Sequence, residues 1–119
     1  MCKFYLYNGI GLPDLSAVVS PLTGWNISDK ELLEIGERVF TLQRMINVRE
    51  GVRRADDQIP AGACKLPEFG QYSKVAECAI KDYEQMLDEY YEARGWDRKT
   101  GIPTKEKLQQ LGLGDLVEL

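Results

Sequence analysis

The segment that decides the fold is "SDKELLEIGERVFTLQRMINVREG", residues 28–51. Ser28 followed by Glu31 matches the S-x-x-E capping box that opens a helix. Steps of three and four then bring a set of apolar side chains to one face. This apolar seam consists of Leu32, Ile35, Val39, Leu42 and Ile46, widened by Leu33, Phe40 and Met45. The spacing predicts a long amphipathic helix that reaches about Arg49 and ends at or shortly after Gly51.

Gly36 lies in the interior of that helix. A glycine there costs roughly 1 kcal/mol of helix propensity relative to alanine. We therefore expect Gly36 to let a neighbouring backbone come close.

Three further helices are predicted on either side of this segment. Residues 13–22 form a short helix, with Pro13 in its first turn and Pro21 limiting its end. A second long helix covers roughly 74–93 and ends at Gly95. Its apolar seam consists of Ala76, Ile80, Tyr83, Leu87 and Tyr90. Thr104 caps a final short helix, which carries Leu108 and Leu111 and stops at Gly112.

These elements predict an all-α fold in which two long helices pack seam to seam and two short helices brace the ends. No segment alternates as a strand would. We expect one domain over residues 1–119, a length that suffices to bury a core. Residues 52–73 hold two prolines and two glycines and are predicted to form a long internal loop. Such loops are usually functional or lie against another part of a protein.

Composition argues against several classes of function. The net charge is −4, and no basic stripe is present, so we expect no binding to nucleic acid. No run approaches the roughly 20 apolar residues of a membrane-spanning helix, so we expect no membrane association. The N-terminal residues make a poor secretion signal. The chain is therefore predicted to be cytoplasmic.

The chain has no histidine and three cysteines, Cys2, Cys64 and Cys78. Their odd number and irregular spacing argue against a disulfide framework, and no C-x-x-C pair indicates zinc. Without histidine the chain lacks the commonest general base and transition-metal ligand. We therefore expect little catalysis by this chain alone, and buried structural roles for Cys64 and Cys78.

Three blocks carry a resemblance to a known family: "TGWNISDKELLEIGERVFTLQRMINVREG" (23–51), "RRADDQIP" (53–60) and "MLDEYYEARGWDRKTGIPTKEKLQQLGL" (86–113). They resemble, in the family's order, the C-terminal domain of tungsten-containing aldehyde ferredoxin oxidoreductases. The resemblance extends from Cys2 to the last predicted helix and is weakest over 61–75. It implies a C-terminal-domain-like helical bundle.

The resemblance also implies a function. Members of this family oxidise aldehydes to carboxylic acids at tungsten, or molybdenum in some relatives, held by two pterin dithiolenes. Electrons pass through an adjacent four-iron, four-sulfur (4Fe-4S) cluster to ferredoxin. Implied partners are therefore ferredoxin and the pterin- and cluster-binding domains of the same enzyme. Tungstopterin and the cluster are expected in the intact enzyme, and no cofactor is expected in the isolated chain.

Cys2 is the site residue that the resemblance implies. The family's last cluster ligand closes a motif of the form Asp-x-x-Gly-Leu-Cys, and "MCKF" begins where that motif ends. Cys2 thereby aligns with the metal-ligating cysteine, whereas Met1 stands in place of leucine and the motif's aspartate is missing. We expect a truncated gene, a split reading frame or an expressed fragment. A 4Fe-4S cluster ordinarily needs four thiolates, so Cys2 would be one ligand of a cluster completed by other domains.

Other polar residues have alternative explanations. Asp56 and Asp57 could face the substrate or pterin side of a complete enzyme, but a solvated charge cluster is the favoured interpretation. Arg49 could form a salt bridge across a domain interface, although helix termination explains it equally well. Three tyrosines are expected along the seam, with their hydroxyls at its rim: Tyr83, Tyr90 and Tyr91.

The leading hypothesis is a C-terminal helical domain that has no catalytic residues of its own and is inactive in isolation. The alternatives are a free-standing helical interaction module and a split subunit derived from that domain. Exposed apolar area on the face that contacts the pterin-binding domains predicts self-association as a homodimer.

Overall fold

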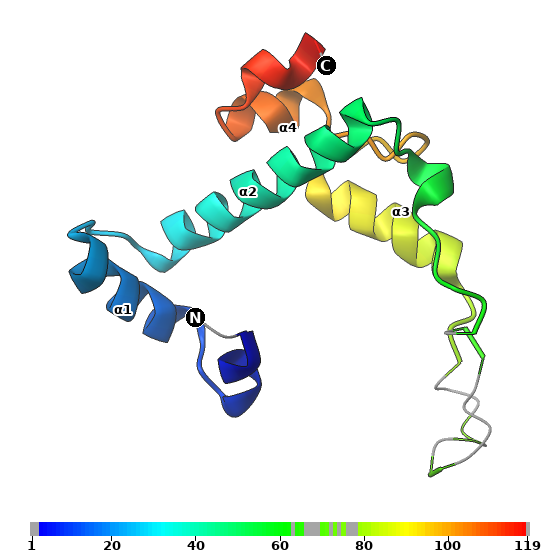
Figure 1. Ribbon diagram of the computed structural model, residues 1–119, viewed down its shortest axis with the longest axis horizontal. Helices are drawn as coiled ribbons and strands as arrows, with labels where there is room; N and C mark the ends of the chain where they lie inside the picture. Colours follow the sequence, from blue (N-terminus) through cyan, green and yellow to red (C-terminus); the bar gives the residue numbers. More distant parts are fainter. Residues whose placement is uncertain are drawn as a thin grey trace. The chain divides into compact units, whose positions relative to one another are not determined.

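The regular elements of the computed structural model are all helices. It describes residues 3–62, 64–65, 70–71, 73, 75 and 79–118. The elements, drawn in Figure 1, are η1 (Lys3–Asn8), α1 (Leu12–Thr23), α2 (Asp29–Arg49), η2 (Arg54–Asp56), α3 (Tyr83–Arg94), α4 (Lys105–Gln110) and η4 (Gly114–Glu118). Within those residues the extended pairing is limited to an isolated bridge between Trp96 and Pro103. The all-α prediction is confirmed.

The chain divides into two compact units, Met1–Phe40 and Thr41–Leu119, called unit 1 and unit 2 below. The expected loop over residues 52–73 includes the short helix η2. The expectation of a single domain over residues 1–119 stays a prediction. None of the helices in the described ranges is long and apolar enough to cross a bilayer.

Unit 1 contains α1 and the first part of α2, joined by a short connection. The backbone N–H of Gly11 donates to the carboxylate of Asp14 at 2.8 Å at the start of α1. The helix continues two residues past Pro21 and ends before Gly24, which adopts a left-handed φ of 72°. Serines on α1 secure the connection: Ser16 bonds the Asp29 carboxylate, and the Ser20 hydroxyl bonds the backbone of Ile27.

The limits of α2 agree with the sequence. The backbone N–H of Ser28 donates to the Glu31 carboxylate at 2.8 Å, and the Glu31 N–H donates to the Ser28 hydroxyl at 3.3 Å. This reciprocal pair is the predicted capping box. The helix ends at Arg49, and Gly51 has a φ of 96°.

The buried face of α2 differs from the predicted seam. Seam residues are exposed in this chain: Val39 to 51%, Leu42 to 39% and Ile46 to 45%. Of the predicted set, Met45 is buried as expected. The buried residues of α2 are Thr41, Arg44, Met45 and Val48. Two helix faces carry apolar residues, and residues far along the chain decide which one this chain covers.

Helix α3 begins at Tyr83, later than the predicted start at 74. Residues 79–82 precede it outside any helix, so the predicted helix is wrong there, and Ile80 belongs to no helical seam. Ala76 of the predicted seam lies outside the described residues. Short helices depend on tertiary packing of their apolar face more than on propensity. Tyr83 is the first residue of α3 and packs against the core cluster of Leu87, Tyr91 and Trp96.

A tight loop follows α3 and leads into α4. Gly95 ends α3 with a φ of 67°, and Trp96 is 5% exposed. The two sides of this loop are joined by a hydrogen bond from the Asp97 N–H to the Ile102 carbonyl at 2.8 Å. Helix α4 opens at Thr104, whose hydroxyl accepts from the Lys107 N–H at 3.2 Å. The predicted cap is confirmed, and Leu108 and Leu111 are both buried.

Candidate functional site

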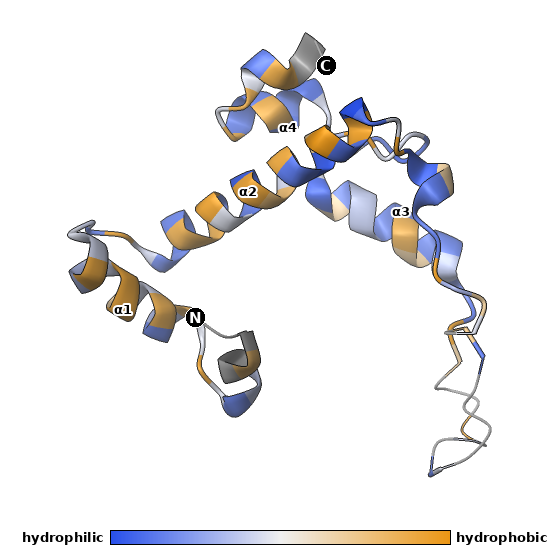
Figure 2. Cartoon of the chain, in the orientation of Figure 1, coloured by the Kyte–Doolittle hydropathy of each residue, from blue (hydrophilic) through white to orange (hydrophobic). Residues whose placement is uncertain are grey.

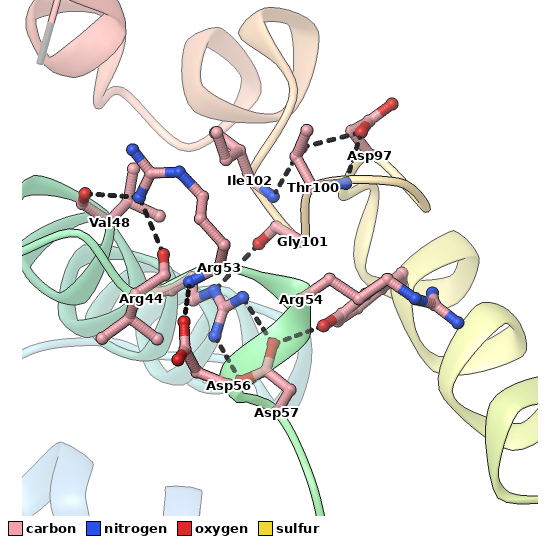
Figure 3. Close-up of polar contacts among 12 residues, drawn as sticks. Arg44, Val48, Arg53, Arg54, Asp56, Asp57, Asp97, Thr100, Gly101 and Ile102 are labelled. Atoms are coloured by element: carbon pink, nitrogen blue, oxygen red, sulfur yellow. Dashed lines mark hydrogen bonds and ion pairs between the residues drawn. The ribbon is translucent and has the colours of Figure 1, made fainter.

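The densest polar cluster of unit 2 is called here the Arg44–Asp57 junction and consists of Arg44, Asp57, Tyr91 and Gly101. Arg44 comes from α2 and its side chain is 7% exposed. Its Nη1 and Nη2 donate to the two carboxylate oxygens of Asp57 at 2.8 and 2.6 Å. Its Nε donates to the carbonyl of Gly101 at 2.8 Å. Figure 3 shows this bidentate pair between α2 and the residue that follows η2.

Two tyrosines of α3 also form hydrogen bonds with Asp57. The Tyr91 hydroxyl donates to the Asp57 carboxylate, and the Tyr83 hydroxyl donates to the Asp57 carbonyl at 2.6 Å. Asp57 therefore belongs to a partly buried ion pair, and its interpretation as part of a solvated charge cluster was wrong. Asp56 is exposed and accepts a bond from the Arg53 backbone N–H at 2.9 Å.

Gly101 fills a space that no larger residue fits. It has a φ of 71°, in the left-handed region that favours glycine. A Cβ at this position would lie 2.8 Å from the Tyr91 Oη and 3.1 Å from its Cζ, and would collide with the Arg44 guanidinium. The carboxylate of Asp97 shapes the approach to Gly101 by accepting from the Thr100 N–H at 2.8 Å. Figure 3 shows this turn beside the junction.

Two arginine side chains of the junction region lie over aromatic rings. The Cζ of Arg44 is 5.1 Å from the Trp96 ring centroid, and the Cζ of Arg54 is 5.4 Å from the Tyr91 centroid. Arg54 also forms ion pairs with Glu84 at 2.7 Å and Asp88 at 2.6 Å. These contacts connect η2 to α3 and so hold the first part of the predicted loop in place.

The junction stays charged at neutral pH. Burial opposes the charge on Asp57, but hydrogen bonds from Arg44 and Tyr91 and the charges of Arg44 and Arg54 outweigh it and lower the pKa of that carboxyl. Burial, followed by the hydrogen bond to Asp57, raises the pKa of the Tyr91 hydroxyl. Neither group titrates near pH 7. The junction is therefore suited to fixing the chain path and not to transferring protons.

The predicted site residues are not brought together by the described structure. Cys2 and Cys78 lie outside the described residues. Cys64 is a half-buried free thiol, which only partly matches the expected burial. Arg49 is exposed and pairs with the adjacent Glu50 at 3.0 Å. No group of three or more histidine, cysteine, aspartate or glutamate residues in the described ranges could hold a metal ion.

Sequence reasoning missed Arg44 and Gly101. Arg44 carried a signal, because Thr41, Arg44, Met45 and Val48 share one face of α2 at steps of three and four. A charged residue among them, followed by an acidic pair in a loop, could have indicated a buried ion pair. Among the tyrosines, Tyr91 is 1% exposed and Tyr90 is 40% exposed, so the buried stripe of α3 includes Tyr91 rather than Tyr90.

Each unit also has an open surface groove. In unit 1 the groove is lined by Trp25, Ile35 and Arg38 with their neighbours, and in unit 2 by Ile80, Met86 and Glu89 with theirs. Small-molecule sites are usually enclosed and largely apolar, with a few convergent polar groups. Neither groove has that character.

Comparison with known proteins identifies the family. The model for "Aldehyde ferredoxin oxidoreductase, domains 2 & 3" matches residues 1–113, which is nearly the whole chain. The chain belongs to the aldehyde ferredoxin oxidoreductase family. The resemblance noted in the sequence is thereby confirmed, as is the correspondence to the helical C-terminal domain of these enzymes.

Individual relatives agree with this assignment. The chain is 32% identical over 116 residues to the tungsten-containing aldehyde ferredoxin oxidoreductase of Pyrococcus furiosus, covering 97% of this chain and 18% of that protein. It is 34% identical over 101 residues to the aliphatic sulfonate oxidoreductase, WOR-like subunit, of the same organism, covering 79% and 16%. The chain therefore spans less than a fifth of the length of these relatives.

A solved structure has the same fold. The active-site complex BamBC of benzoyl coenzyme A reductase, determined with 1,5-dienoyl-CoA, matches with a TM-score of 0.71 at 30% identity. The match covers 92% of this chain and 15% of that one. In that structure too, a fold like this one is a small part of a longer polypeptide.

Proposed function

We propose that this chain works as the helical C-terminal domain of a tungsten-dependent enzyme that oxidises an aldehyde to a carboxylic acid in the cytoplasm. Electrons would leave through a 4Fe-4S cluster to ferredoxin. The observation that carries the proposal is the family match over residues 1–113, supported by relatives named tungsten-containing aldehyde ferredoxin oxidoreductase that align with 97–98% of this chain. The reacting groups belong to the rest of that enzyme.

The donor set of the chain fits part of one cofactor site. A 4Fe-4S cluster takes four thiolates, and the chain has three cysteines in total. We propose that Cys2 supplies one cluster ligand and that other domains supply the remainder. Tungstopterin, which would supply the oxidation chemistry, would be held by those domains.

The role of unit 2 in this proposal is structural. The Arg44–Asp57 junction joins α2, the residue after η2, α3 and the loop before α4 through hydrogen bonds of Arg44 and Asp57, which are both charged at neutral pH. Rigid support of this kind keeps cofactor-facing segments of an enzyme at a fixed distance from their partners.

A second candidate concerns the substrate. One relative is named an aliphatic sulfonate oxidoreductase and is 34% identical to this chain. The same helical domain would then serve an enzyme that acts on an aliphatic sulfonate. A direct comparison of the two substrate classes separates these candidates.

The experiment uses a hybrid enzyme, in which this chain replaces the matching segment of the Pyrococcus furiosus aldehyde ferredoxin oxidoreductase. We expect the hybrid to bind tungsten and iron and to reduce ferredoxin when an aldehyde is added. An aliphatic sulfonate is tested in parallel. The same replacement is therefore made in the aliphatic sulfonate oxidoreductase of that organism. If only that second hybrid folds, binds its metals and acts on its substrate, the second candidate replaces the aldehyde proposal.

The role of Cys2 is tested in the same hybrid. Cys2→Ser should lower the iron content and the cluster absorbance, because one thiolate is lost. Cys64→Ser is the matched control and should leave both unchanged. Equal iron in the Cys2→Ser variant and the unsubstituted hybrid would show that Cys2 is not a cluster ligand.

A further inference from the structure

Unit 1 buries no apolar side chain among the residues whose burial the structure describes. Among its described residues, the buried class contains Ser16 alone. Large apolar side chains are exposed, among them Val18 to 50%, Leu22 to 80%, Trp25 to 63%, Leu33 to 60% and Val39 to 51%. Unit 2, in contrast, buries aromatic and aliphatic side chains from α2, α3 and α4. Figure 2 shows the apolar residues along α1 and α2 in orange.

The exposed Leu33 and Val39 form a continuous face on α2 together with half-buried apolar neighbours. At 3.6 residues per turn, four apolar residues and one glycine lie on the same side of the helix. This α2 docking face consists of Leu32, Leu33, Ile35, Gly36 and Val39. Gly36 lies in its middle, because Leu32, Leu33 and Val39 are three or four positions away.

The described residues of unit 1 do not account for Gly36. It lies in the interior of an α-helix, where glycine is a poor helix former. Apart from the adjacent residues and the backbone of the helix itself, no atom of the described part of the chain lies within 4 Å of the position that a Cβ would occupy. Gly101 differs, because a Cβ there would collide with Arg44 and Tyr91. A glycine on an exposed apolar face is explained if a backbone from outside the chain approaches it.

We infer that the α2 docking face binds the remaining polypeptide of the same enzyme, with a backbone segment of that polypeptide lying against Gly36. The inference rests on the proposed function, in which this chain is one domain of a longer protein. The chain covers 18% of the Pyrococcus furiosus relative, so most of such an enzyme lies outside it. A unit without its own core needs that polypeptide to cover its apolar side chains.

The test compares the effect of one substitution, Gly36→Ala, on thermal stability in the isolated chain and in the hybrid enzyme, where we expect opposite changes. In the isolated 119-residue chain, Gly36→Ala should raise the midpoint of thermal helix loss by about 4 °C, because alanine favours the helix and meets no neighbour. Circular dichroism measures this. In the hybrid enzyme described above, Gly36→Ala should lower the melting temperature, and Gly36→Leu should reduce the yield of folded enzyme several-fold.

Glu34→Ala is the matched control. Glu34 is exposed on the opposite side of α2 and its contact is an exposed pair with Arg38 at 3.7 Å. This substitution should change little in either the isolated chain or the hybrid. A comparable loss of folded hybrid for Glu34→Ala would mean that the effect is not specific to the α2 docking face.

The outcomes separate the inference from the proposed function. If the hybrid folds and binds its metals but Gly36→Ala stabilises it as in the isolated chain, the inference fails and the proposed function stands. If the unsubstituted hybrid does not fold while the parent enzyme does, the proposed function fails and the inference with it. If the isolated chain forms a dimer in sedimentation that Gly36→Leu abolishes, the occupant is a second copy and the inference is overturned.

Discussion

At the scale of single residues, Arg44 is the group whose burial would be most unfavourable without partners. A buried charge is tolerated when it is paired and its remaining donors are bonded. Three nitrogens of Arg44 donate to Asp57 and Gly101, and the guanidinium also lies over the Trp96 ring. Substitutions at the residues that bond Arg44 should therefore be destabilising, although these residues are polar.

Removing the carboxylate should destabilise unit 2. Asp57→Ala leaves the guanidinium of Arg44 buried without its charge partner and is expected to cost about 3 kcal/mol of unfolding free energy. Urea unfolding followed by circular dichroism measures the change. Glu84→Ala removes an exposed partner of Arg54 and should cost less than about 1 kcal/mol. Equal losses for the two variants would contradict the assignment of the junction.

The pH dependence of stability follows from Asp57. Its folded pKa lies below the ordinary value of 3.8, so its contribution is fully present above that value and is lost as the pH falls through the lower folded pKa. Stability of the unsubstituted chain should therefore decline below pH 4. Asp57→Asn, which cannot titrate, should show a shallower decline over the same range in acid unfolding. A parallel decline in both proteins would remove Asp57 as the cause.

Alkaline titration tests the other side of the junction. The folded pKa of Tyr91 is raised above its ordinary value of 10.0, so the stability that Tyr91 contributes is present below pH 10 and is lost as the pH rises further. Tyr91→Phe should be less stable at pH 7 by about 1 kcal/mol but should lose less stability between pH 9 and pH 11. Chemical unfolding at both pH values measures this. An unchanged alkaline slope would refute the prediction.

Gly101 allows a matched comparison between two glycines. Gly101 and Gly112 both have left-handed φ values, 71° and 67°, but only at Gly101 would a Cβ collide with neighbours. Gly112→Ala should cost about 1 kcal/mol, the penalty of the backbone conformation alone. Gly101→Ala should cost at least about 2 kcal/mol more, or prevent folding of unit 2. Thermal unfolding of both variants measures the difference between the two costs. Similar midpoints would show that the residues around Gly101 can move to accommodate a Cβ.

At the scale of elements, local capping residues set where a helix begins and ends, whereas residues distant in the sequence set which of its faces is buried. Helix α2 begins at its capping box, α3 ends at Gly95, and α4 ends at Gln110, shortly before the expected Gly112. The buried faces of α2 and α3 were predicted less well. In α3 the buried residues are Leu87 and Tyr91, because Tyr91 bonds Asp57 and packs on Trp96.

The cap of α4 should be measurable by substitution. Thr104→Ala removes the acceptor of the Lys107 N–H and should cost about 1 kcal/mol. Thr104→Ser keeps the hydroxyl and should be close to neutral. Guanidinium unfolding compares the three proteins. A neutral Thr104→Ala would mean that packing of Leu108 and Leu111 alone holds this six-residue helix.

At the scale of the whole molecule, the two units differ in how much apolar surface they bury. The buried hydrophobic residues all belong to unit 2 among the described ranges, from Met45 to Leu111. Local stability follows buried apolar contacts. Unit 2 should therefore behave as the stable unit of the isolated chain, and unit 1 should depend on external contacts.

Hydrogen exchange measured by mass spectrometry tests this difference. Amides of α1 and of residues 29–40 should exchange at least tenfold faster than those of α3, because unit 1 lacks buried apolar residues in its described part. In the hybrid enzyme, residues 29–40 should become protected. Equal protection of the two units in the isolated chain would contradict the description of unit 1 as lacking a core.

The sequence by itself determined the all-α class, the family and most helix ends. These depend on local signals, such as the Ser28–Glu31 box, Gly95 and Thr104, whose partners lie within a few residues. Only the tertiary structure decided that α2 buries Arg44 against Asp57 and Gly101, residues 13 and 57 positions away. The apolar seam of α2 has the period expected of a buried face, and periodicity identifies such a face without saying which polypeptide covers it. Here the chain covers the Arg44 side because two of its own loops bring Asp57 and Gly101 there.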